Sequence, residues 1–351
     1  MRSRFSLTAI VLLSFVLHAL LLVLLPDDGQ VVESIYVRGV YPVLAPVVSL
    51  LPSMLPFSVT TVGTAILLLW AFAVLLVHIR RWLMKRTGFM RAIGRTLASW
   101  GLVAIVLFHA FYLFWGYHYL RVPLEDRLAL AAVDSSDAAR TATSRLMVQR
   151  AVDAIVPIEP WDRSELDRLI DVAIDQAMLE LEELPVPVTS PLKGDLALPF
   201  LAVFGQSGFL SPLTLEPHVD TQMPPFQVAF TAAHEKAHLV GYARERDANF
   251  IAWYALTRSD DPRLQFAGHF GVARYFRNGA TRDLFEPLNP YYRMLTEYSA
   301  ARVSPTLRDA NRRIYNVYMR ANRMQAGLAD YGEVASLIHS WLLQEPRMND
   351  R

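Results

Sequence analysis

Three uninterrupted apolar stretches lie in the first third of the chain, at residues 5–25, 59–79 and 97–120, and none contains Asp, Glu, Lys or Arg. At about 1.5 Å of rise per residue, a helix of roughly 20 residues crosses the hydrocarbon layer of a bilayer. A helix buried in a soluble core usually keeps a polar stripe, and these stretches have none. We therefore predict a three-helix transmembrane region over residues 1–120.

The first stretch follows Arg2 and Arg4, so a signal peptide is the alternative. It is longer than the apolar part of a typical signal peptide, and Pro26-Asp27-Asp28 follows it instead of a small-residue cleavage site. We therefore interpret it as an uncleaved anchor. The segment from Tyr41 to Phe57 is also apolar, but four prolines interrupt it, which favours a re-entrant or surface-lying piece over a further span.

Charge in the short loops predicts the orientation of the spans. The loop of residues 80–96 contains no acidic residue and six basic ones: Arg80, Arg81, Lys85, Arg86, Arg91 and Arg95. Only Arg38 is basic between the first two stretches. Because basic loops stay in the cytoplasm, the N-terminus and this loop are expected there, and everything after Leu120 is expected on the outer side.

The remaining residues, 121–351, carry charges at ordinary density and suffice for one domain with its own core. Helical periodicity covers residues 134–154 and 163–184, the second with Ser164 as a predicted cap. Helical patterns resume at Phe230 and continue through residues 252–256, 264–277, 290–300, 305–322 and 332–343. Strands at 196–204 and 209–219, separated by Gly205-Gln206-Ser207-Gly208, are predicted to form a hairpin. The fold class is mainly α with a small β-sheet.

Composition changes this picture in two respects. The 351 residues are 53% hydrophobic and 19% charged, as expected of a membrane protein. The net charge of +1 offers no field that would recruit nucleic acid, which we exclude as a partner. The absence of cysteine excludes a disulfide framework, a thiolate metal site and a cysteine nucleophile.

The residues most suggestive of chemistry are His234, Glu235 and His238, which form an HExxH motif. Residues i and i+4 of a helix lie about 40° apart around its axis, so both imidazoles can bind one Zn²⁺. Glu235 is about 100° round from His234, where a general base can take a proton from water. We predict a zinc site with Glu235 as the catalytic base, the alternative being two histidines that merely face solvent or the core.

The third zinc ligand is expected after a break at Gly241, where a left-handed residue can end a helix. A second helix can then fold back and present Glu245 as a ligand, whereas one continuous helix would carry it about 10 Å too far. Asn249, four residues further, would hydrogen-bond a ligating imidazole and fix its tautomer. Asp247 points about 200° away from Glu245, and Arg244 stands where a metzincin has its third histidine.

HExxH followed by ExxAN resembles the gluzincin-type zinc metallopeptidases. The chain also resembles an uncharacterised bacterial family of membrane-anchored HExxH proteins, through its spans and through Pro-Pro-Phe at 224–226, Phe-Thr-Ala at 230–232, Gly to Asn at 241–249 and Tyr-Gly at 331–332. The resemblance implies a zincin-like fold and a protease, without a named substrate. Lys236 departs from the apolar residue usual in that family, which predicts an exposed outer face or a paired ammonium group.

We therefore expect a membrane-anchored zinc metallopeptidase of the bacterial cytoplasmic membrane, with its catalytic domain outside and a peptide or protein as substrate. One alternative is a non-catalytic envelope scaffold that keeps a zincin-like fold, and another is a transporter or sensor with a coincidental motif. The stretch 209–219 is the nearest candidate for a substrate-binding strand. Candidate oxyanion donors, each more often structural, are Tyr242, His269, Tyr275, Tyr291, Tyr292 and Arg302, and His218 is expected to be incidental.

Overall fold

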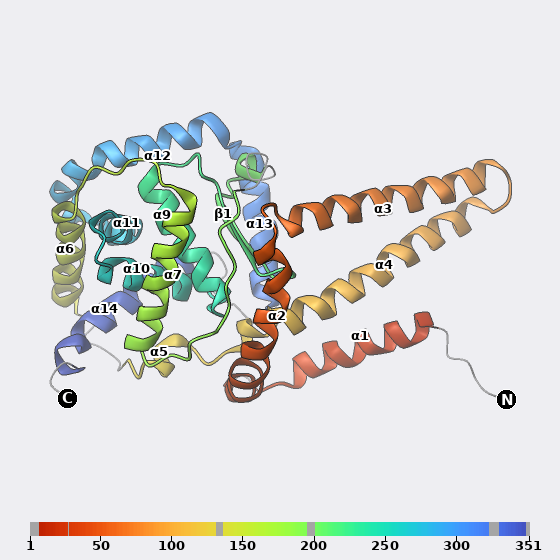
Figure 1. Cartoon of the computed structure of the whole chain (residues 1–351), viewed down its shortest axis with the longest axis horizontal. Helices are drawn as coiled ribbons and strands as arrows, with labels where there is room; N and C mark the ends of the chain where they lie inside the picture. Colours follow the sequence, from red (N-terminus) through yellow and green to blue (C-terminus); the bar gives the residue numbers. More distant parts are fainter. Residues whose placement is uncertain (1–6, 27, 131–135, 195–200, 323–329, 349–351) are drawn as a thin grey trace.

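Most of the chain that the structure describes is helical, and its helices form two parts (Figure 1). The computed structural model describes residues 7–26, 28–130, 136–194, 201–322 and 330–348. One part is a group of long N-terminal helices that projects to one side, and the other is a rounded body built mostly from later residues. The predicted fold class, mainly α with a small β-sheet, is confirmed.

Three apolar helices project from the body: α1 (Leu7–Leu24), α3 (Val59–Leu83) and α4 (Phe89–Phe114). α3 and α4 form an antiparallel hairpin, and α1 packs beside α4. With 25 and 26 residues, α3 and α4 are long and apolar enough to cross a bilayer. The start of α1 and the turn between α3 and α4 lie at the same far end, as the predicted orientation requires. These helices are compatible with membrane association.

The third apolar stretch of the sequence, residues 97–120, does not coincide with one helix. α4 begins earlier, at Phe89, and ends at Phe114, and Gly116–Leu120 form a short 3-10 helix, η2. Trp115 and Tyr119 are each only 5% exposed, because they pack into the body. Aromatic residues therefore extend the apolar run of the sequence past the end of the helix.

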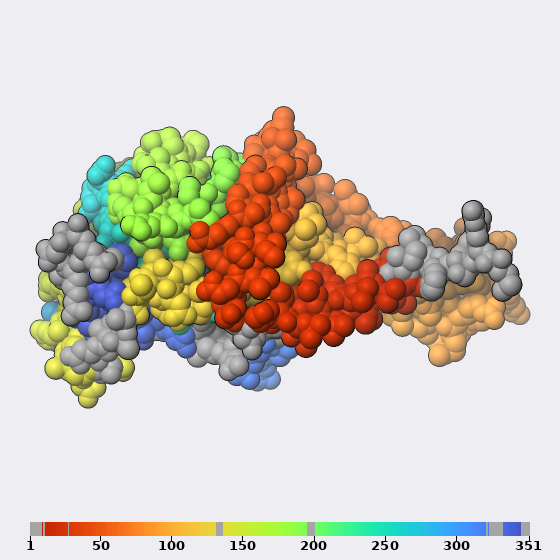
Figure 2. All heavy atoms as spheres, turned by 90° about the horizontal axis from the view of Figure 1, so that it is seen from below, coloured from red at the N-terminus to blue at the C-terminus, as the bar shows by residue number. Residues whose placement is uncertain are grey.

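The chain between the first two stretches forms a π-helix, η1 (Val32–Val40), and the proline-rich segment after it then forms α2 (Tyr41–Met54). By length and hydropathy Val32–Met54 also qualifies as a span. However, α2 runs across the base of the apolar helices instead of along them (Figures 1 and 2). Its inner face packs on the body, where the Tyr41 hydroxyl donates to Leu239 O at 2.6 Å and Ser53 Oγ donates to Thr189 O. This packing agrees with a surface-lying piece.

The body is a set of helices around α10 (Glu245–Arg258), whose residues from Asp247 to Leu256 are all buried. α10 packs against α7 (Arg163–Glu180), α9 (Pro225–Leu239), α11 (Pro262–Ala273) and α14 (Asp330–Met348). Around them lie α5 (Leu124–Arg127), α6 (Asp137–Asp153), α12 (Asn289–Arg302), α13 (Pro305–Ala321) and the 3-10 turns η3 (Ala202–Phe204), η4 (Arg274–Phe276), η5 (Gly279–Thr281) and η6 (Asp283–Leu288). 

The predicted N-cap of α7, Ser164, was wrong. The N-cap of α7 is Asp162, whose Oδ1 accepts from Glu165 N at 2.9 Å. Ser164 lies inside the helix and donates its hydroxyl to that carboxylate. An aspartate two residues earlier supplies a charged acceptor at the positive end of the helix dipole, which a serine hydroxyl does not.

The predicted hairpin was placed wrongly. The strands are β1 (Gly208–Ser211) and β2 (Glu216–Val219), antiparallel from Gly208 opposite Val219 to Ser211 opposite Glu216. Apart from Gly208, which was predicted to be in the turn, both lie within the second predicted strand, 209–219. Residues 195–200 lie outside the described part, and η3 occupies 202–204. Gly205, with φ of 77°, ends that 3-10 turn instead of joining two strands, and the hairpin turns at residues 212–215.

Buried charges tie the body to the apolar helices. The Glu216 carboxylate on β2 accepts hydrogen bonds from Val59 N at 2.9 Å, Thr60 N at 2.7 Å and Thr60 Oγ1 at 2.6 Å, so it caps α3 from outside that helix. Arg121, after η2, pairs with Glu33 of η1 at 2.8 Å. The predicted division of the chain at residue 120 stays a prediction, but residues on both sides of it share one core.

Candidate metal centre

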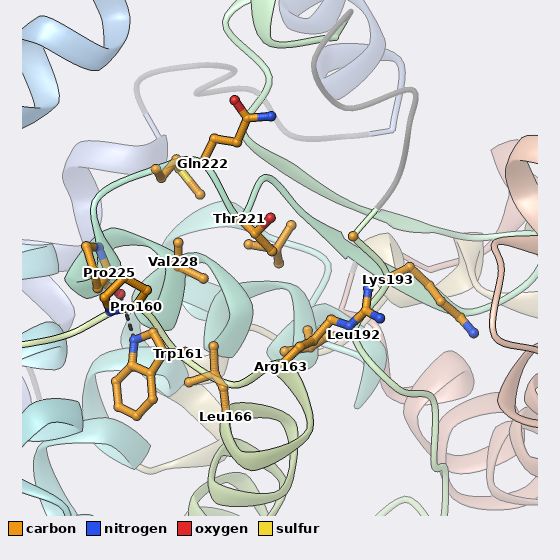
Figure 3. A pocket seen from close by; sticks show the side chains of 13 residues that line it. Pro160, Trp161, Arg163, Leu166, Leu192, Lys193, Thr221, Gln222, Pro225 and Val228 are labelled. Atoms are coloured by element: carbon orange, nitrogen blue, oxygen red, sulfur yellow. Dashed lines mark hydrogen bonds between the residues drawn. The ribbon is translucent and has the colours of Figure 1, made fainter.

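The HExxH residues lie in the last two turns of α9, a helix that the core surrounds. Pro225 occupies its first turn, where a missing N–H costs nothing, and nearly all its residues are buried. Trp161 Nε1 donates to Pro225 O at 2.9 Å and fixes this end of the helix, at the side of a cavity of about 290 Å³ (Figure 3). That cavity is lined mainly by apolar groups with Arg163 and Lys193, and it contains no carboxylate or histidine.

α9 ends beside Gly241, and the end is sterically defined. Gly241 has φ of 96°, a left-handed conformation that other residues avoid, and an added Cβ would lie 2.6 Å from the His118 ring. After this turn the chain enters α10 with Glu245 as its first residue. The two helices therefore meet at an angle that brings the start of α10 to the end of α9, as the sequence predicts from Gly241.

The structure brings the three predicted ligands together. Oε2 of Glu245 lies 3.1 Å from Nε2 of His234 and 3.7 Å from Nε2 of His238. One ligand atom from each residue fits within a mutual distance of 4.8 Å, and among the described residues this is the one group of its kind. His234 is half-buried, and the other two are buried.

Hydrogen bonds on the far side of each imidazole determine its tautomer. Nδ1 of His238 lies 2.6 Å from Tyr242 O, and Nδ1 of His234 lies 3.0 Å from Oδ1 of Asn249, as predicted for that residue. Both oxygens accept, so both histidines donate from Nδ1 and turn the lone pair of Nε2 toward Glu245. Three electron-pair donors then converge on one point, an arrangement that a cation satisfies.

Electrostatics at this point also favour positive charge. Burial lowers the pKa of His238, but the Glu245 and Glu235 carboxylates beside it outweigh burial and raise that pKa to about 9. Burial raises the pKa of Glu245, yet hydrogen bonds to the two histidines hold it well below its usual value. The carboxylates therefore create a field in which a proton or a metal ion is stabilised between the rings.

Glu235 stands beside the three ligands without joining them. It is 5% exposed, and burial raises its pKa above the usual value, against the opposing pull of the two histidines. The backbone of Leu210 on β1 lowers the pKa of its carboxylate, and an added Cβ on Gly208 would lie 2.9 Å from its Oε1. Oε2 has no hydrogen-bond partner among the described residues. A buried carboxylate with an oxygen left for a further partner is suited to accept a proton.

The cluster lies in a cleft of about 620 Å³ between β1, α9 and α13. The Tyr315 hydroxyl of α13 donates to Oε1 of Glu245, the oxygen that faces away from the histidines. Arg274 and Tyr275 of η4 line the cleft, as do Arg308 and Arg312 of α13. The sequence pattern predicted the α13 helix but gave no sign of which of its faces meets Glu245, so Tyr315 was missed.

The predicted oxyanion donors are scattered. Tyr275 lines the cleft, but the Tyr242 hydroxyl is buried against Met178 Sδ at 3.4 Å. Arg302 lies 3.7 Å from Asp220, and the remaining three do not line the cleft: His269, Tyr291 and Tyr292. His218 on β2 is fully buried and its ring stacks on Phe209, with 4.3 Å between ring centroids, as expected for a structural residue.

Lys236, the residue that departs from the expected apolar one, is a paired ammonium group. It is 2% exposed, and its Nζ lies 2.8 Å from Asp167, 2.7 Å from Asp171 and 2.9 Å from Ser190 O. Of the two predicted possibilities, the exposed outer face is therefore wrong. The three partners hold α9 against α7, on the side away from the metal cluster.

A comparison with protein families gives one match. The model of a family described as "Protein of unknown function (DUF3810)" matches residues 36–339, which include the second half of η1, α2, the apolar hairpin, and all the residues of the cluster and of its cleft. No curated protein and no solved structure matches the chain significantly.

Proposed function

The chain belongs to the DUF3810 family, whose function is unknown, and we propose that it is a membrane-anchored zinc metallopeptidase. The observation that carries the proposal is the convergence of His234, His238 and Glu245 on one point, with the carboxylate of Glu235 beside it. The HExxH and ExxAN spacing resembles that of gluzincin-type peptidases, which supports the same reading.

The donor set suits zinc. Two imidazole nitrogens and one carboxylate oxygen are typical of catalytic zinc sites, which use three protein ligands and leave a position for solvent or substrate. When bound, zinc supplies a Lewis acid that polarises a carbonyl group and makes water more acidic. Asn249 and Tyr242 orient the two imidazoles, and Tyr315 orients the Glu245 carboxylate.

In the proposed reaction Glu235 moves the proton. Its free Oε2 accepts a proton from the attacking water and later delivers it to the leaving amine of the cleaved peptide bond. β1 lies beside this carboxylate, since an added Cβ on Gly208 would lie 2.9 Å from its Oε1. Among the described residues β1 pairs only with β2, so its second edge, beside Glu235, is available to an extended peptide. Tyr275 and Arg312 offer donors to a substrate carbonyl in the same cleft.

The proposed location is the bacterial cytoplasmic membrane, with the cleft on the extracytoplasmic side. α3 and α4, which are long and apolar enough to cross, would span the bilayer together with α1. The six basic residues between 80 and 95, in the turn between α3 and α4 and in the helix ends beside it, would stay in the cytoplasm. The body begins at the opposite end of the apolar helices from the turn between α3 and α4 (Figure 1), so in the proposed orientation it would lie outside. A reporter fused after Leu120 tests this topology, and a cytoplasmic signal would contradict it.

Metal analysis of the purified full chain, followed by hydrolysis of a fluorescently labelled unfolded protein, tests the proposal. We expect about one zinc per chain, lost in His234→Ala, and hydrolysis that stops in Glu235→Gln while zinc is retained. Glu297→Gln, an exposed glutamate on α12, is the matched control and keeps both. Retained zinc without hydrolysis in the wild type would favour the alternative of a non-catalytic envelope scaffold, and absence of zinc would refute both readings.

A further inference from the structure

α13 has two faces of opposite character. Side chains that line the metal cleft lie on one face: Arg308, Asn311, Arg312, Tyr315 and Tyr318. At 100° per residue, Ala310, Ile314 and Val317 lie on the other side of the helix, with Leu307 at the border between the two faces. Ile314 is 70% exposed and Val317 is 69% exposed, so this apolar face is covered by nothing in the described structure. A helix of 17 residues thus presents polar groups to the protein and apolar groups to the outside.

α13 is attached to the base of the apolar helices. The Tyr112 hydroxyl of α4 donates to Oδ1 of Asn322, the residue that ends α13, at 2.9 Å. The rings of Phe111 and Tyr318 lie 6.3 Å apart. Figure 1 shows α13 running across the direction of α3 and α4, at the level where they join the body. The C-terminal end of α13 therefore lies beside the last turn of α4.

α2 repeats this arrangement at the same level. It too runs across the apolar helices and packs one face on the body (Figures 1 and 2). Val43, Val47 and Met54 on its opposite face are 72%, 67% and 74% exposed. The exposed apolar faces of α2 and α13 thus lie beside the ends of α3 and α4 that join the body. A bilayer crossed by α3 and α4 would therefore have its surface at the level of both faces.

The charged residues of α13 favour a bilayer over a purely apolar protein surface as the partner of its exposed face. Arg313 and Arg320 flank the exposed apolar face, and they are exposed. α13 contains four arginines and one acidic residue, Asp309. A helix with an apolar face bordered by arginines is typical of the interface of a membrane with anionic headgroups.

We propose that α13 lies in the headgroup layer of the bilayer that α3 and α4 cross, with Leu307, Ile314 and Val317 in contact with lipid. The inner face of the same helix forms one wall of the metal cleft, so the cleft opens at the membrane surface. A consequence, which rests on the proposed peptidase function, is that the substrates are polypeptide segments lying next to a bilayer, such as those beside a membrane anchor.

The absence of cysteine allows a direct test with single labels. Ile314→Cys and Val317→Cys are labelled with an environment-sensitive fluorophore in the full chain, in nanodiscs of zwitterionic and anionic lipids that contain a nitroxide-labelled lipid. The matched control is Leu146→Cys, an exposed leucine on α6, at the end of the body away from the apolar helices (Figure 1). We expect the nitroxide lipid to quench the labels at 314 and 317 at least threefold more than the label at 146.

Equal quenching at the three positions overturns the proposal. Protection of residues 314 and 317 from a water-soluble quencher, without quenching by lipid, also overturns it and indicates that a second copy or another protein covers α13. The measurement needs neither metal nor hydrolysis, so it is repeated in Glu235→Gln, which should keep zinc without hydrolysis, and in His234→Ala, which should lose zinc. Lipid quenching in a chain without zinc or activity would leave this proposal standing while the proposed function fails.

Discussion

The Tyr315 hydroxyl connects the outermost wall of the cleft with the metal cluster. It donates to one oxygen of Glu245 while the other oxygen faces the two histidines, so it sets the rotation of the carboxylate. Partners that orient metal ligands typically change metal affinity 10- to 100-fold when they are removed. Because Tyr315 belongs to α13, the proposed membrane-surface helix also helps to shape the metal site.

We predict that Tyr315→Phe lowers zinc affinity about 10-fold, because Glu245 loses the hydrogen bond that orients it. Competition with a chromophoric chelator measures the affinity. Tyr318→Phe, three residues along the same cleft wall, is the control and should keep wild-type affinity, since its hydroxyl does not reach the cluster through a described hydrogen bond. Equal affinity in the wild type and Tyr315→Phe would show that the carboxylate is oriented by other contacts.

At the scale of elements, the site depends on how α9 ends. Three carbonyl groups there accept hydrogen bonds from residues near the apolar helices: His238 O from Trp115 Nε1 at 2.8 Å, Leu239 O from Tyr41 and Gly241 O from Arg121. Helix C-termini leave such carbonyls unsatisfied, so these side chains complete α9. These contacts therefore fix the end of α9 up to and including Gly241.

We predict that Gly241→Ala destabilises the protein by about 1–3 kcal/mol, the usual cost of a strained backbone residue, and also weakens metal binding. The new Cβ would meet the His118 ring and would require a left-handed alanine. Any shift moves Tyr242 O, which holds His238. Thermal unfolding followed by tryptophan fluorescence measures the effect. Gly279→Ala, where nothing lies within 4 Å of the added Cβ, is the control, and similar losses in both variants would disprove the argument.

The cap that β2 places on α3 gives a pH-dependent prediction. Burial raises the pKa of Glu216, but hydrogen bonds from Thr60 and Val59 outweigh burial and hold the pKa below its usual value. A depressed pKa in the folded state stabilises the protein above the unfolded pKa, and the stabilisation is lost as pH falls through the folded pKa. Glu216→Gln should therefore cost about 1.5–3 kcal/mol at neutral pH and progressively less below about pH 4.

Unfolding temperatures measured from pH 7 to pH 3 check this prediction. The difference between wild type and Glu216→Gln should shrink as the pH falls, whereas the exposed Glu297→Gln should differ little from wild type throughout. A difference that stays constant with pH would mean that the negative charge of Glu216 does not contribute to the cap.

For the whole molecule, the sequence predicts those features of the site that depend on residues close together in the chain. His234, Glu235, His238, Gly241 and Glu245 lie close together in the chain, and helix geometry suffices to place them near one point. Contacts between distant segments were not predictable in this way. The hydrogen bond from Tyr41 to Leu239 spans 198 residues, and that from Tyr315 to Glu245 spans 70.

The hairpin shows a different kind of failure. The run Gly205 to Gly208 has the composition of a turn between strands, yet Gly205 ends a 3-10 turn, and the chain reverses at Pro212 to Leu215 instead. Leu215 has φ of 55°, unusual for leucine, and its side chain is fully buried. Burial of that side chain offsets the strained backbone, and such tertiary compensation is invisible to turn propensities.

The cluster, the cleft and the base of the apolar helices form one assembly. The central prediction is that the cluster in it binds zinc. The direct measurement is zinc K-edge X-ray absorption on the full chain, purified without a metal-binding tag, in wild type and Glu245→Ala. We predict two imidazole nitrogens at about 2.0–2.1 Å with only nitrogen and oxygen ligands in the wild type, and an altered or empty site in the variant. A wild-type chain without stoichiometric zinc, or a spectrum unaffected by Glu245→Ala, would contradict the account.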